Sequence, residues 1–495
     1  MKLNQLLQNL NPVEILGNLE KRIENITFDS RAASNGSLFV AVKGTQVDGH
    51  NFIFKALASG CTAVVCERWD EPVNEQMTMI IVKDTAEALG ILSSNFFGNP
   101  TNELKLVGVT GTNGKTTTTT LCYDLFTRLG YKVGLISTVE NRIADKIVPS
   151  THTTPDPLQM NALLKKMRDE GCEYVFMEVS SHAIDQRRIA GLRFTGAFFT
   201  NLTHDHLDYH KTFDAYLKAK KRLFDDLPKD AFALTNADDR NGAVMLQNTK
   251  AKTYSYGLKK MATFKAKILD NGITGLHLEL DRQDFICRLI GEFNAYNLLA
   301  VYGVATLLGA DKSDFLPILS DLTGAEGRFD CIQADGITAI VDYAHSPDAL
   351  EKVLSTLDDI RKGKGNIITV VGCGGDRDRD KRPLMAKMAC DYSNHVVLTA
   401  DNPRNEDPEE IIKEMQVGVP VGSKRKVLVI TDREQAIRTA FRLAAKDDFV
   451  LVAGKGHEKY QEFEKKHRIY FDDKAILLNE MKNISLPTEF GKTLQ

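Results

Sequence analysis

The sequence predicts an α/β protein built from three units, and three observations support this fold class. The chain of 495 residues is too long for one ordinary hydrophobic core, so more than one domain is expected. Short apolar runs alternate with helical runs, which is typical of parallel sheets covered by helices. Glycine- or proline-containing segments at Phe97-Gly98-Asn99-Pro100 and Gly324-Ala325-Glu326-Gly327-Arg328-Phe329 divide this pattern into three units.

The first unit is a small α/β region without a nucleotide loop of its own. Its predicted strands are 38–42, 63–66 and 79–82, and a predicted helix covers 51–59, with Gly60 after it as a stop signal. Two polar turns, 28–31 and 44–50, have side chains that could hold a ligand. Their composition alone favours ordinary turns.

The second unit begins with a strand that leads into a glycine-rich loop. The apolar run 104–109 is followed by Gly111-Thr112-Asn113-Gly114-Lys115-Thr116-Thr117 and by a helical run to Leu129. Backbone N–H groups and a helix N-terminus bind anions, lysine adds a positive charge, and threonine can ligate Mg²⁺. The spacing differs from the strict P-loop because Val109 stands where that pattern has its first glycine. We interpret the loop as a phosphate site rather than as a plain turn that opens a helix.

Polar residues follow further predicted strands of this unit. The strands are 131–137, 174–179 and 196–201, and a helix is predicted over 157–170. Ligands bind at the carboxyl ends of parallel strands, and Glu178-Val179-Ser180-Ser181-His182 and Asn201-Leu202-Thr203-His204-Asp205-His206 lie at such ends. Glu178 and His206 favour a Mg²⁺ site over a zinc site, because cysteine partners are missing. The basic run 218–222 is by default a solvated helix face.

The rest of the chain predicts a β-rich patch, a helix and a third α/β unit. The patch covers 250–290 and the helix runs to Leu308; Asn294 and Asn297 near its start suit either helix capping or purine binding. The strands of the third unit are 337–341, 366–371, 395–399 and 449–452. Arg377, Arg404 and Glu458 follow these strands and suit a zwitterion with more than one carboxylate, although each alone would more often be a surface charge.

Composition narrows the class of protein. A net charge of −3, 43% hydrophobic and 26% charged residues are typical of a soluble globular protein without a nucleic-acid-binding surface. We expect no signal peptide and no membrane insertion. The eight cysteines are scattered without a CxxC pair, which predicts reduced thiols in a cytoplasmic enzyme.

With these motifs in place, the chain resembles the Mur ligase family over essentially its whole length. The residues that carry the resemblance are Thr110 to Thr117, Glu178-Val179-Ser180-Ser181-His182, Gly291-Glu292-Phe293-Asn294-Ala295-Tyr296-Asn297, Gly327-Arg328-Phe329 and Asp342-Tyr343-Ala344-His345. The altered loop spacing is the family's own form. The resemblance implies a UDP-substrate-binding domain (1–98), a central P-loop ATPase domain (99–329) and a Rossmann-like amino-acid-binding domain (330–495).

The resemblance also implies an activity. Within the family the chain is most similar to ligases that add meso-2,6-diaminopimelate to UDP-N-acetylmuramoyl-L-alanyl-D-glutamate in peptidoglycan synthesis. The substrate carboxylate would attack the γ-phosphate of ATP to give an acyl phosphate, which the incoming amine then attacks. The implied partners are these small molecules, with no nucleic acid, and the expected state is a monomer in the cytoplasm.

Residue roles follow from the resemblance by position. ATP contacts are implied for Gly111, Thr112, Asn113, Gly114, Lys115, Thr116, Thr117, Asn294, Arg328 and Asp342. Contacts to the UDP-muramoyl dipeptide are implied for Ser30, Thr45, Gln46, Val47, Thr153, Thr154, Ser180, Gln186 and Arg188. Metal and catalytic roles are implied for Lys115, Thr116, Glu178, His206 and Lys220, the last as a carbamate that would hold a second Mg²⁺. His152 stands where the family pattern leads us to expect asparagine, so no role is assigned to it.

The choice of amino acid rests on Asp401-Asn402-Pro403-Arg404, which is similar to the diaminopimelate form of the family. Arg377, Gly454 and Glu458 would complete the pocket. Diaminopimelate differs from lysine by one distal carboxylate, which Arg404 can pair with bidentately. Three alternatives stay open: a lysine-adding ligase, a folylpolyglutamate synthase-like ligase, and a nucleotide-dependent regulatory or binding module that has lost catalysis.

Overall fold

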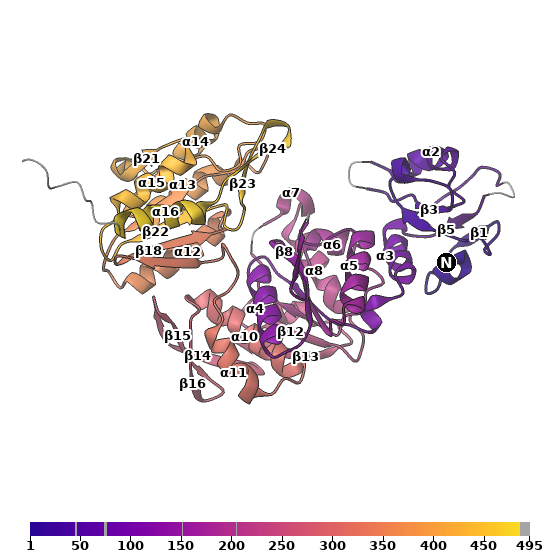
Figure 1. Cartoon of the computed structure of the whole chain (residues 1–495), viewed down its shortest axis with the longest axis horizontal. Coiled ribbons are helices and arrows are strands. Elements are labelled where there is room, and N and C mark those ends of the chain that lie inside the picture. The colour runs from indigo at the N-terminus through magenta and orange to yellow at the C-terminus, as the bar shows by residue number, and fades with distance from the viewer. Residues whose placement is uncertain (45–46, 74–76, 151, 204, 486–495) are drawn as a thin grey trace, which may run out of the picture.

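The computed structural model describes residues 1–44, 47–73, 77–150, 152–203 and 205–485. In the described residues, three large sheets, each with its own helices, form three lobes in a row along the longest axis, with the N-terminal lobe at one end and the C-terminal lobe at the other (Figure 1). The mixed α/β architecture and the three units predicted from the sequence are confirmed. The proposed domain limits at 98/99 and 329/330 stay a prediction.

The N-terminal sheet has the strand order β1-β5-β4-β3-β2, in which only β1 is antiparallel to its neighbour. Its strands are β1 (Glu14–Leu16), β2 (Asn25–Thr27), β3 (Ser37–Val40), β4 (Ala63–Cys66) and β5 (Met79–Ile81). Its helices are α1 (Leu3–Leu6), α2 (Ile53–Ala58) and α3 (Thr85–Phe96). Helix α3 lies between this lobe and the central one (Figure 1) and packs against α5 (Pro157–Asp169).

The central sheet runs β16-β15-β14-β13-β12-β11-β6-β10-β7-β8-β9 and is parallel in its middle, with antiparallel hairpins at both ends. The parallel strands are β6 (Lys105–Thr110), β7 (Val133–Ile136), β10 (Tyr174–Glu178), β11 (Gly196–Phe199), β12 (Phe232–Asn236) and β13 (Lys252–Gly257). The outer strands are β8 (Glu140–Ile143), β9 (Lys146–Pro149), β14 (Phe264–Gly272), β15 (Gly275–Leu280) and β16 (Gln283–Cys287). The predicted β-rich patch at 250–290 is therefore confirmed.

Helices cover both faces of the central sheet, as the alternation of elements predicted. One apolar core joins the sheet to α4 (Lys115–Arg128), α10 (Glu292–Leu307) and α11 (Lys312–Asp321), and a second core joins it to α5 and α8 (Phe213–Asp225). Shorter helices are α6 (Ser181–Asp185), α7 (Leu207–His210) and α9 (Gly242–Met245). With helices on both faces, ligands have access to this sheet at its edges and strand ends.

The C-terminal sheet has the order β17-β18-β22-β19-β20-β21, with only β17 antiparallel. Its strands are β17 (Asp330–Ala334), β18 (Ile337–Asp342), β19 (Ile367–Val371), β20 (His395–Leu398), β21 (Val427–Val429) and β22 (Phe449–Ala453), and a hairpin follows, β23 (Tyr460–Phe463) and β24 (His467–Tyr470). Its helices are α12 (Pro347–Arg361), α13 (Lys381–Tyr392), α14 (Pro408–Gln416), α15 (Arg433–Leu443) and α16 (Asp473–Ser485). The sequence predicted four of these strands but not the hairpin.

Candidate active site

The glycine-rich loop joins β6 to α4, and two of its glycines are required by its geometry. Gly111 has φ 155°, and a Cβ there would lie 1.9 Å from Thr200 Oγ1. Gly114 has φ 87°, and a Cβ there would lie 2.6 Å from Asn297 Oδ1. Side chains at either position would collide with neighbours and would also be strained at these positive φ angles. The loop therefore packs closely against Thr200 and Asn297 at these two glycines.

The end of β11 holds this loop in shape. Asn201 accepts hydrogen bonds from Thr112 N through its carbonyl (2.8 Å) and from Asn113 N through Oδ1 (3.0 Å). Thr200 Oγ1 donates to Asn113 O at 2.6 Å. Because these partners directly follow the buried central strand β11, the backbone of the loop is fixed before any ligand arrives.

Lys115 begins α4 and its amine lies against the loop. Its Nζ donates to Gly111 O (3.0 Å) and Thr112 O (2.9 Å). Burial lowers the pKa of Lys115, while the carboxylates of Glu178 and Asp205 act in the opposite direction. The next two residues, Thr116 and Thr117, are buried at the first turn of the same helix. The predicted loop, lysine and threonines thus form one structural unit.

Arg328 connects this loop to the C-terminal sheet. Its Nη2 donates to Thr116 Oγ1 (3.3 Å), and its guanidinium lies 4.3 Å from the ring centroid of Tyr343. Tyr343 Oη in turn donates to Glu458 Oε1 at 3.4 Å. The polar chain Thr116–Arg328–Tyr343–Glu458 therefore runs from the phosphate loop to a residue predicted for the amino-acid pocket.

Asp342 and Asn294 are the other predicted nucleotide residues, and both are buried. Asp342 accepts hydrogen bonds from Phe329 N (2.6 Å) and Ala344 N (2.7 Å), and burial raises its pKa. Asn294 Nδ2 donates to Ile290 O (2.8 Å), and its Oδ1 accepts from Asn297 Nδ2 (2.9 Å). In this structure the Asn294 amide bonds Ile290, just before α10, and Asn297 within it, and neither bond caps the helix, because Gly291 is the N-cap residue and no side-chain cap is present.

Glu178, at the end of β10, is a fully buried carboxylate that is held by a threonine the sequence did not single out. Thr138 N donates to Glu178 Oε1 at 2.8 Å, and the Thr138 hydroxyl lies 3.2 Å from Oε2. The same hydroxyl lies 3.0 Å from Thr153 Oγ1. Thr138 thus places a predicted metal ligand next to a predicted substrate contact.

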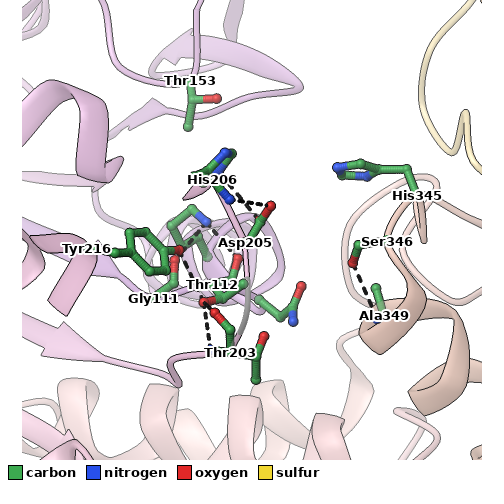
Figure 2. Close-up of polar contacts among 12 residues, drawn as sticks. Gly111, Thr112, Thr153, Thr203, Asp205, His206, Tyr216, His345, Ser346 and Ala349 are labelled. Atoms are coloured by element: carbon green, nitrogen blue, oxygen red, sulfur yellow. Dashed lines mark hydrogen bonds and ion pairs between the residues drawn. The ribbon is translucent and has the colours of Figure 1, made fainter. Parts of the chain in front are cut away.

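Asp205 and His206 face the C-terminal lobe. Asp205 Oδ1 accepts from His206 N at 2.9 Å, and the two side chains form a close pair at 3.5 Å. Burial lowers the pKa of His206 to about 4. The ring of His345, from the loop before α12, points toward this pair (Figure 2). Burial alone would raise the pKa of Asp205, but the charges of His206 and then of His345 and Lys115 lower it below its ordinary value.

Thr112, Tyr216 and Thr203 form a second small network below this pair (Figure 2). Thr112 Oγ1 lies 3.2 Å from Tyr216 Oη and accepts from Thr203 N at 3.0 Å. Thr203 Oγ1 also donates to Asp348 Oδ2 (3.0 Å), which accepts from Asn113 Nδ2 at 3.3 Å. Asp348 lies in the first turn of α12, so the C-terminal lobe touches the phosphate loop directly.

Lys220 is a buried lysine on α8, not part of the solvated face that its sequence neighbourhood suggested. Its Nζ donates to Gly111 O (2.8 Å) and Thr110 Oγ1 (3.5 Å) and lies 4.7 Å from the ring centroid of Tyr216. Burial and the nearby charge of Lys115 hold the pKa of Lys220 well below its ordinary value. Lys220 is therefore an uncommon group: an amine whose charged form is disfavoured at the base of the phosphate loop.

The predicted dipeptide contacts lie together around the start of α6. Thr154 Oγ1 donates to Glu178 O (2.9 Å) and accepts from Ser180 N (3.1 Å), and Ser180 Oγ caps α6 by accepting from Ala183 N. Arg188 donates to Thr154 O (2.8 Å) and, through Nε and Nη2, to Gln186 Oε1. One network therefore joins four of the five predicted residues, and Thr153 joins it through Thr138.

Two further predicted contacts to the UDP-muramoyl dipeptide, Ser30 and Val47, lie in the N-terminal lobe, far along the chain from the phosphate loop. Ser30 is buried at the start of a short 3₁₀ turn that Asp29 caps. Val47 is exposed, while Thr45 and Gln46 lie outside the described residues. His152, whose role the sequence left unassigned, lies beside Ser150, whose Oγ donates to its carbonyl at 3.1 Å.

Most of the predicted amino-acid pocket is brought together at the carboxyl end of the C-terminal sheet. Asn402 Nδ2 donates to Glu458 Oε2 (2.8 Å), and its Oδ1 accepts from Lys455 Nζ (2.9 Å). A Cβ on Gly454 would lie 2.5 Å from Asp401 Oδ2, so glycine is required there. The residues placed together are Asp401, Asn402, Pro403, Arg404, Gly454 and Glu458. Arg377 is exposed in the loop after β19, where its Cγ lies near Gly374.

The donor atoms near the phosphate loop suit one class of metal ion. Among the described residues, no group of three or more His, Cys, Asp or Glu side chains could hold a metal ion. The oxygen donors at hand are the buried carboxylate of Glu178 and the hydroxyl of Thr116. This set fits Mg²⁺ that arrives with a nucleotide, because such an ion takes few protein ligands and draws the others from phosphate and water.

Comparison with known proteins agrees with this architecture. The model of the Mur ligase middle domain matches residues 109–305, that of the Mur ligase glutamate ligase domain matches 327–456, and that of the Mur ligase family catalytic domain matches 22–97. The chain belongs to the Mur ligase family, a class of ATP-dependent ligases. No helix in the described part of the chain is long and apolar enough to cross a membrane.

Individual relatives agree on one name. A protein of Cytophaga hutchinsonii called UDP-N-acetylmuramoyl-L-alanyl-D-glutamate–2,6-diaminopimelate ligase is 55% identical over 479 residues, covering 96% of this chain and 98% of its own. A Bacteroides fragilis protein with the same name is 53% identical over 478 residues, covering 96% and 98%. A solved structure titled as the same ligase has a TM-score of 0.71 at 33% identity, covering 98% of this chain and 99% of its own.

Proposed function

We propose that this protein is the ATP-dependent ligase that adds meso-2,6-diaminopimelate to UDP-N-acetylmuramoyl-L-alanyl-D-glutamate. The observation that carries the proposal is the near-full-length identity of 55% and 53% to two relatives that bear this name. The position of Arg404 supports it, because this cation lies in the predicted pocket where a second carboxylate of the amino acid would be recognised.

The reaction follows from the chemistry of the two substrates. A carboxylate is a poor acylating agent, so the D-glutamate carboxylate first attacks the γ-phosphorus of ATP and ADP leaves. The amine of diaminopimelate then attacks the acyl phosphate, a tetrahedral intermediate forms, and inorganic phosphate leaves as the amide forms. The site must therefore offset negative charge on phosphate and hold three reactants in line.

The chain's own residues divide these tasks. The backbone of Gly111 to Lys115 and the N-terminus of α4 bind the phosphates, and Lys115 and Arg328 offset their charge. Thr154, Ser180, Gln186 and Arg188 hold the dipeptide end of the nucleotide sugar beside Glu178. Arg404 and Glu458 bind the distal carboxylate and ammonium of the amino acid.

Two further groups belong to the proposal. Glu178, His206 and Thr116 would hold Mg²⁺, which supplies charge stabilisation at the phosphates when bound. Lys220 would carry a carbamate and so become an anionic ligand for a second Mg²⁺. Its position supports this, because it is fully buried and touches the loop at Gly111 O, where a permanent ammonium is costly and an anion could meet a metal.

One assay separates this function from its rivals. ATP-dependent addition of meso-diaminopimelate and of L-lysine to UDP-N-acetylmuramoyl-L-alanyl-D-glutamate is measured side by side. We expect strong preference for diaminopimelate; preference for lysine would identify the lysine-adding ligase instead. ADP release that needs neither co-substrate would point to a regulatory module. The N-terminal Mur domain over 22–97 argues against a folylpolyglutamate synthase, which needs no uridine site.

We further propose a cytoplasmic monomer that meets only small-molecule substrates. The substrates are soluble nucleotides and an amino acid, and each lobe contributes one predicted binding site within a single chain. Size-exclusion chromatography with light scattering tests the oligomeric state.

A further inference from the structure

The β23–β24 hairpin, which the sequence did not predict, lies directly against the specificity tetrapeptide 401–404. Gln461 Nε2 donates to Asp401 O at 2.7 Å. The backbone of Glu462 makes two hydrogen bonds to this tetrapeptide: its N–H donates to Asn402 Oδ1 (2.9 Å) and its carbonyl accepts from Arg404 N (3.0 Å). The hairpin therefore fixes the backbone on either side of Pro403.

The side chain of Glu462 continues this contact to the guanidinium of Arg404. Glu462 Oε1 lies 3.3 Å from Arg404 Nε, and its Oε2 accepts from Arg468 Nε (2.8 Å) and lies 2.7 Å from Arg468 Nη2. Burial alone would raise the pKa of Glu462, but the two arginines lower it below its ordinary value, so the carboxylate is charged. Only 12% of the Glu462 side chain is exposed, which limits screening by solvent.

These contacts orient Arg404 in one direction. Its Nε faces Glu462, and its Nη1 donates to Gly375 O at 2.7 Å. Among the described residues no acceptor takes the Nη2 donors. The edge of the guanidinium formed by Nη1 and Nη2 can therefore still bind a carboxylate end-on. The Arg404 backbone is itself in the left-handed region, at φ 53°.

We infer that Glu462 is a positioning residue that aims Arg404 at the distal carboxylate of the amino-acid substrate, and so helps to select a substrate with two carboxylates. This inference rests on the proposed function. Its physical basis is preorganisation: an arginine whose rotamer is already fixed does not lose that freedom when the substrate binds.

The charges of the cluster suit the same role. Arg404 and Arg468 carry two positive charges and Glu462 one negative charge, so the trio keeps one net positive charge for an incoming carboxylate. Arg468 lies 4.0 Å from the ring centroid of Tyr460 and 55% of its side chain is exposed, so it anchors Glu462 from the solvent side. Glu462 thus lies between Arg468, which anchors it, and Arg404, which would bind the substrate carboxylate.

The test is the variant Glu462→Gln, which keeps the shape of the side chain and removes its charge. We expect the KM for meso-diaminopimelate to rise about tenfold, with kcat and the KM for ATP changed less than about twofold. The control is Glu464→Gln, which removes one charge from an exposed position of the same hairpin and leaves all three constants unchanged.

A double-mutant cycle separates positioning from a general structural effect. Arg404→Ala alone should raise the KM for diaminopimelate more than that for ATP, and adding Glu462→Gln to it should raise the KM for diaminopimelate no further. Additive effects, an unchanged KM in Glu462→Gln, or a parallel rise in the KM for ATP would overturn the inference. If Glu462→Gln folds poorly, Glu462→Asp replaces it in the same cycle, because it keeps the charge but not the reach.

Failure of the proposed function and failure of the inference about Glu462 give different results in these assays. If the wild-type protein and Glu464→Gln do not add diaminopimelate at all, the proposed function fails. If both add it and Glu462→Gln does so with an unchanged KM, the proposed function stands and only the positioning role of Glu462 is wrong.

Discussion

Thr138 shows how much of this site depends on single polar atoms. It is not part of any glycine-rich or charged motif, yet its N–H and hydroxyl both contact the Glu178 carboxylate, and the hydroxyl also reaches Thr153. A buried carboxylate that loses a hydrogen-bond partner bears an uncompensated desolvation cost, so its side chain is no longer held in one orientation. The orientation of Glu178 therefore depends on a residue 40 positions earlier in the chain.

We predict that Thr138→Val weakens the use of Mg²⁺. Valine keeps the backbone N–H but removes the hydroxyl, so one of two contacts to Glu178 is lost. The Mg²⁺ concentration for half-maximal activity should rise, and kcat should fall about tenfold. Titrating Mg²⁺ at saturating ATP measures both. Thr127→Val, an exposed threonine on α4, is the control, and equal Mg²⁺ curves for the two variants would contradict the prediction.

Lys220→Ala should abolish most ligase activity while ATP binding persists. The lysine is buried at the base of the loop, and in the proposed mechanism its carbamate acts on a metal rather than on the phosphates. Activity should fall by at least about a hundredfold, and titration calorimetry should give an ATP affinity close to that of the wild type. Lys218→Ala, whose side chain is 74% exposed on the same helix, is the control. An active Lys220→Ala enzyme would reject the carbamate.

The sequence predicts those strands and loops whose structure is determined by their own residues. The strands 63–66 and 174–178 are apolar runs, and the phosphate loop carries its glycines and lysine in sequence. The hairpin 460–470 is polar and half-exposed, and its contacts come from the tetrapeptide 401–404, which is distant in sequence. The roles of Thr138 and Glu462 were missed for the same reason, because nothing local marks them.

The conformation of the phosphate loop leads to a matched pair of glycine variants. Gly111→Ala should lose ATP binding by more than about tenfold, because its Cβ would lie 1.9 Å from Thr200 Oγ1 and the loop would have to move. Gly130 lies just after the end of the same helix, α4, and no atom lies within 4 Å of a Cβ built there. Gly130→Ala, at φ 93°, should therefore cost only about 1–2 kcal/mol of stability. Calorimetric ATP binding and thermal unfolding of both variants check the prediction.

For the whole molecule, the arrangement of lobes matters because each lobe carries one predicted substrate site. The N-terminal lobe is joined to the central one through α3 and α5 and through ion pairs of Arg187 with Asp84 and Glu87. The C-terminal lobe touches the phosphate loop through Asp348. Contacts between domains of this size are typically modest, so relative motion of the lobes is the default expectation.

Asp348→Ala should loosen the C-terminal lobe. Asp348 Oδ2 accepts from Thr203 and Asn113 of the central lobe, and alanine removes both bonds. We expect a larger radius of gyration by small-angle X-ray scattering and a lower kcat, with a melting temperature within about 4 °C of the wild type. Asp358→Ala is the control, because Asp358 on the same helix pairs with Arg361 within α12. Identical scattering curves for the two variants would show that Asp348 does not hold the lobes.

The polar chain from Thr116 through Arg328 and Tyr343 to Glu458 has a thermodynamic consequence. It places the phosphate loop and the amino-acid pocket in physical contact through two side chains. If bound nucleotide changes the dissociation constant of the amino acid by some factor, thermodynamic linkage requires that the bound amino acid changes the dissociation constant of the nucleotide by the same factor. Replacing Tyr343 with leucine would change both factors together, by the same amount and in the same direction.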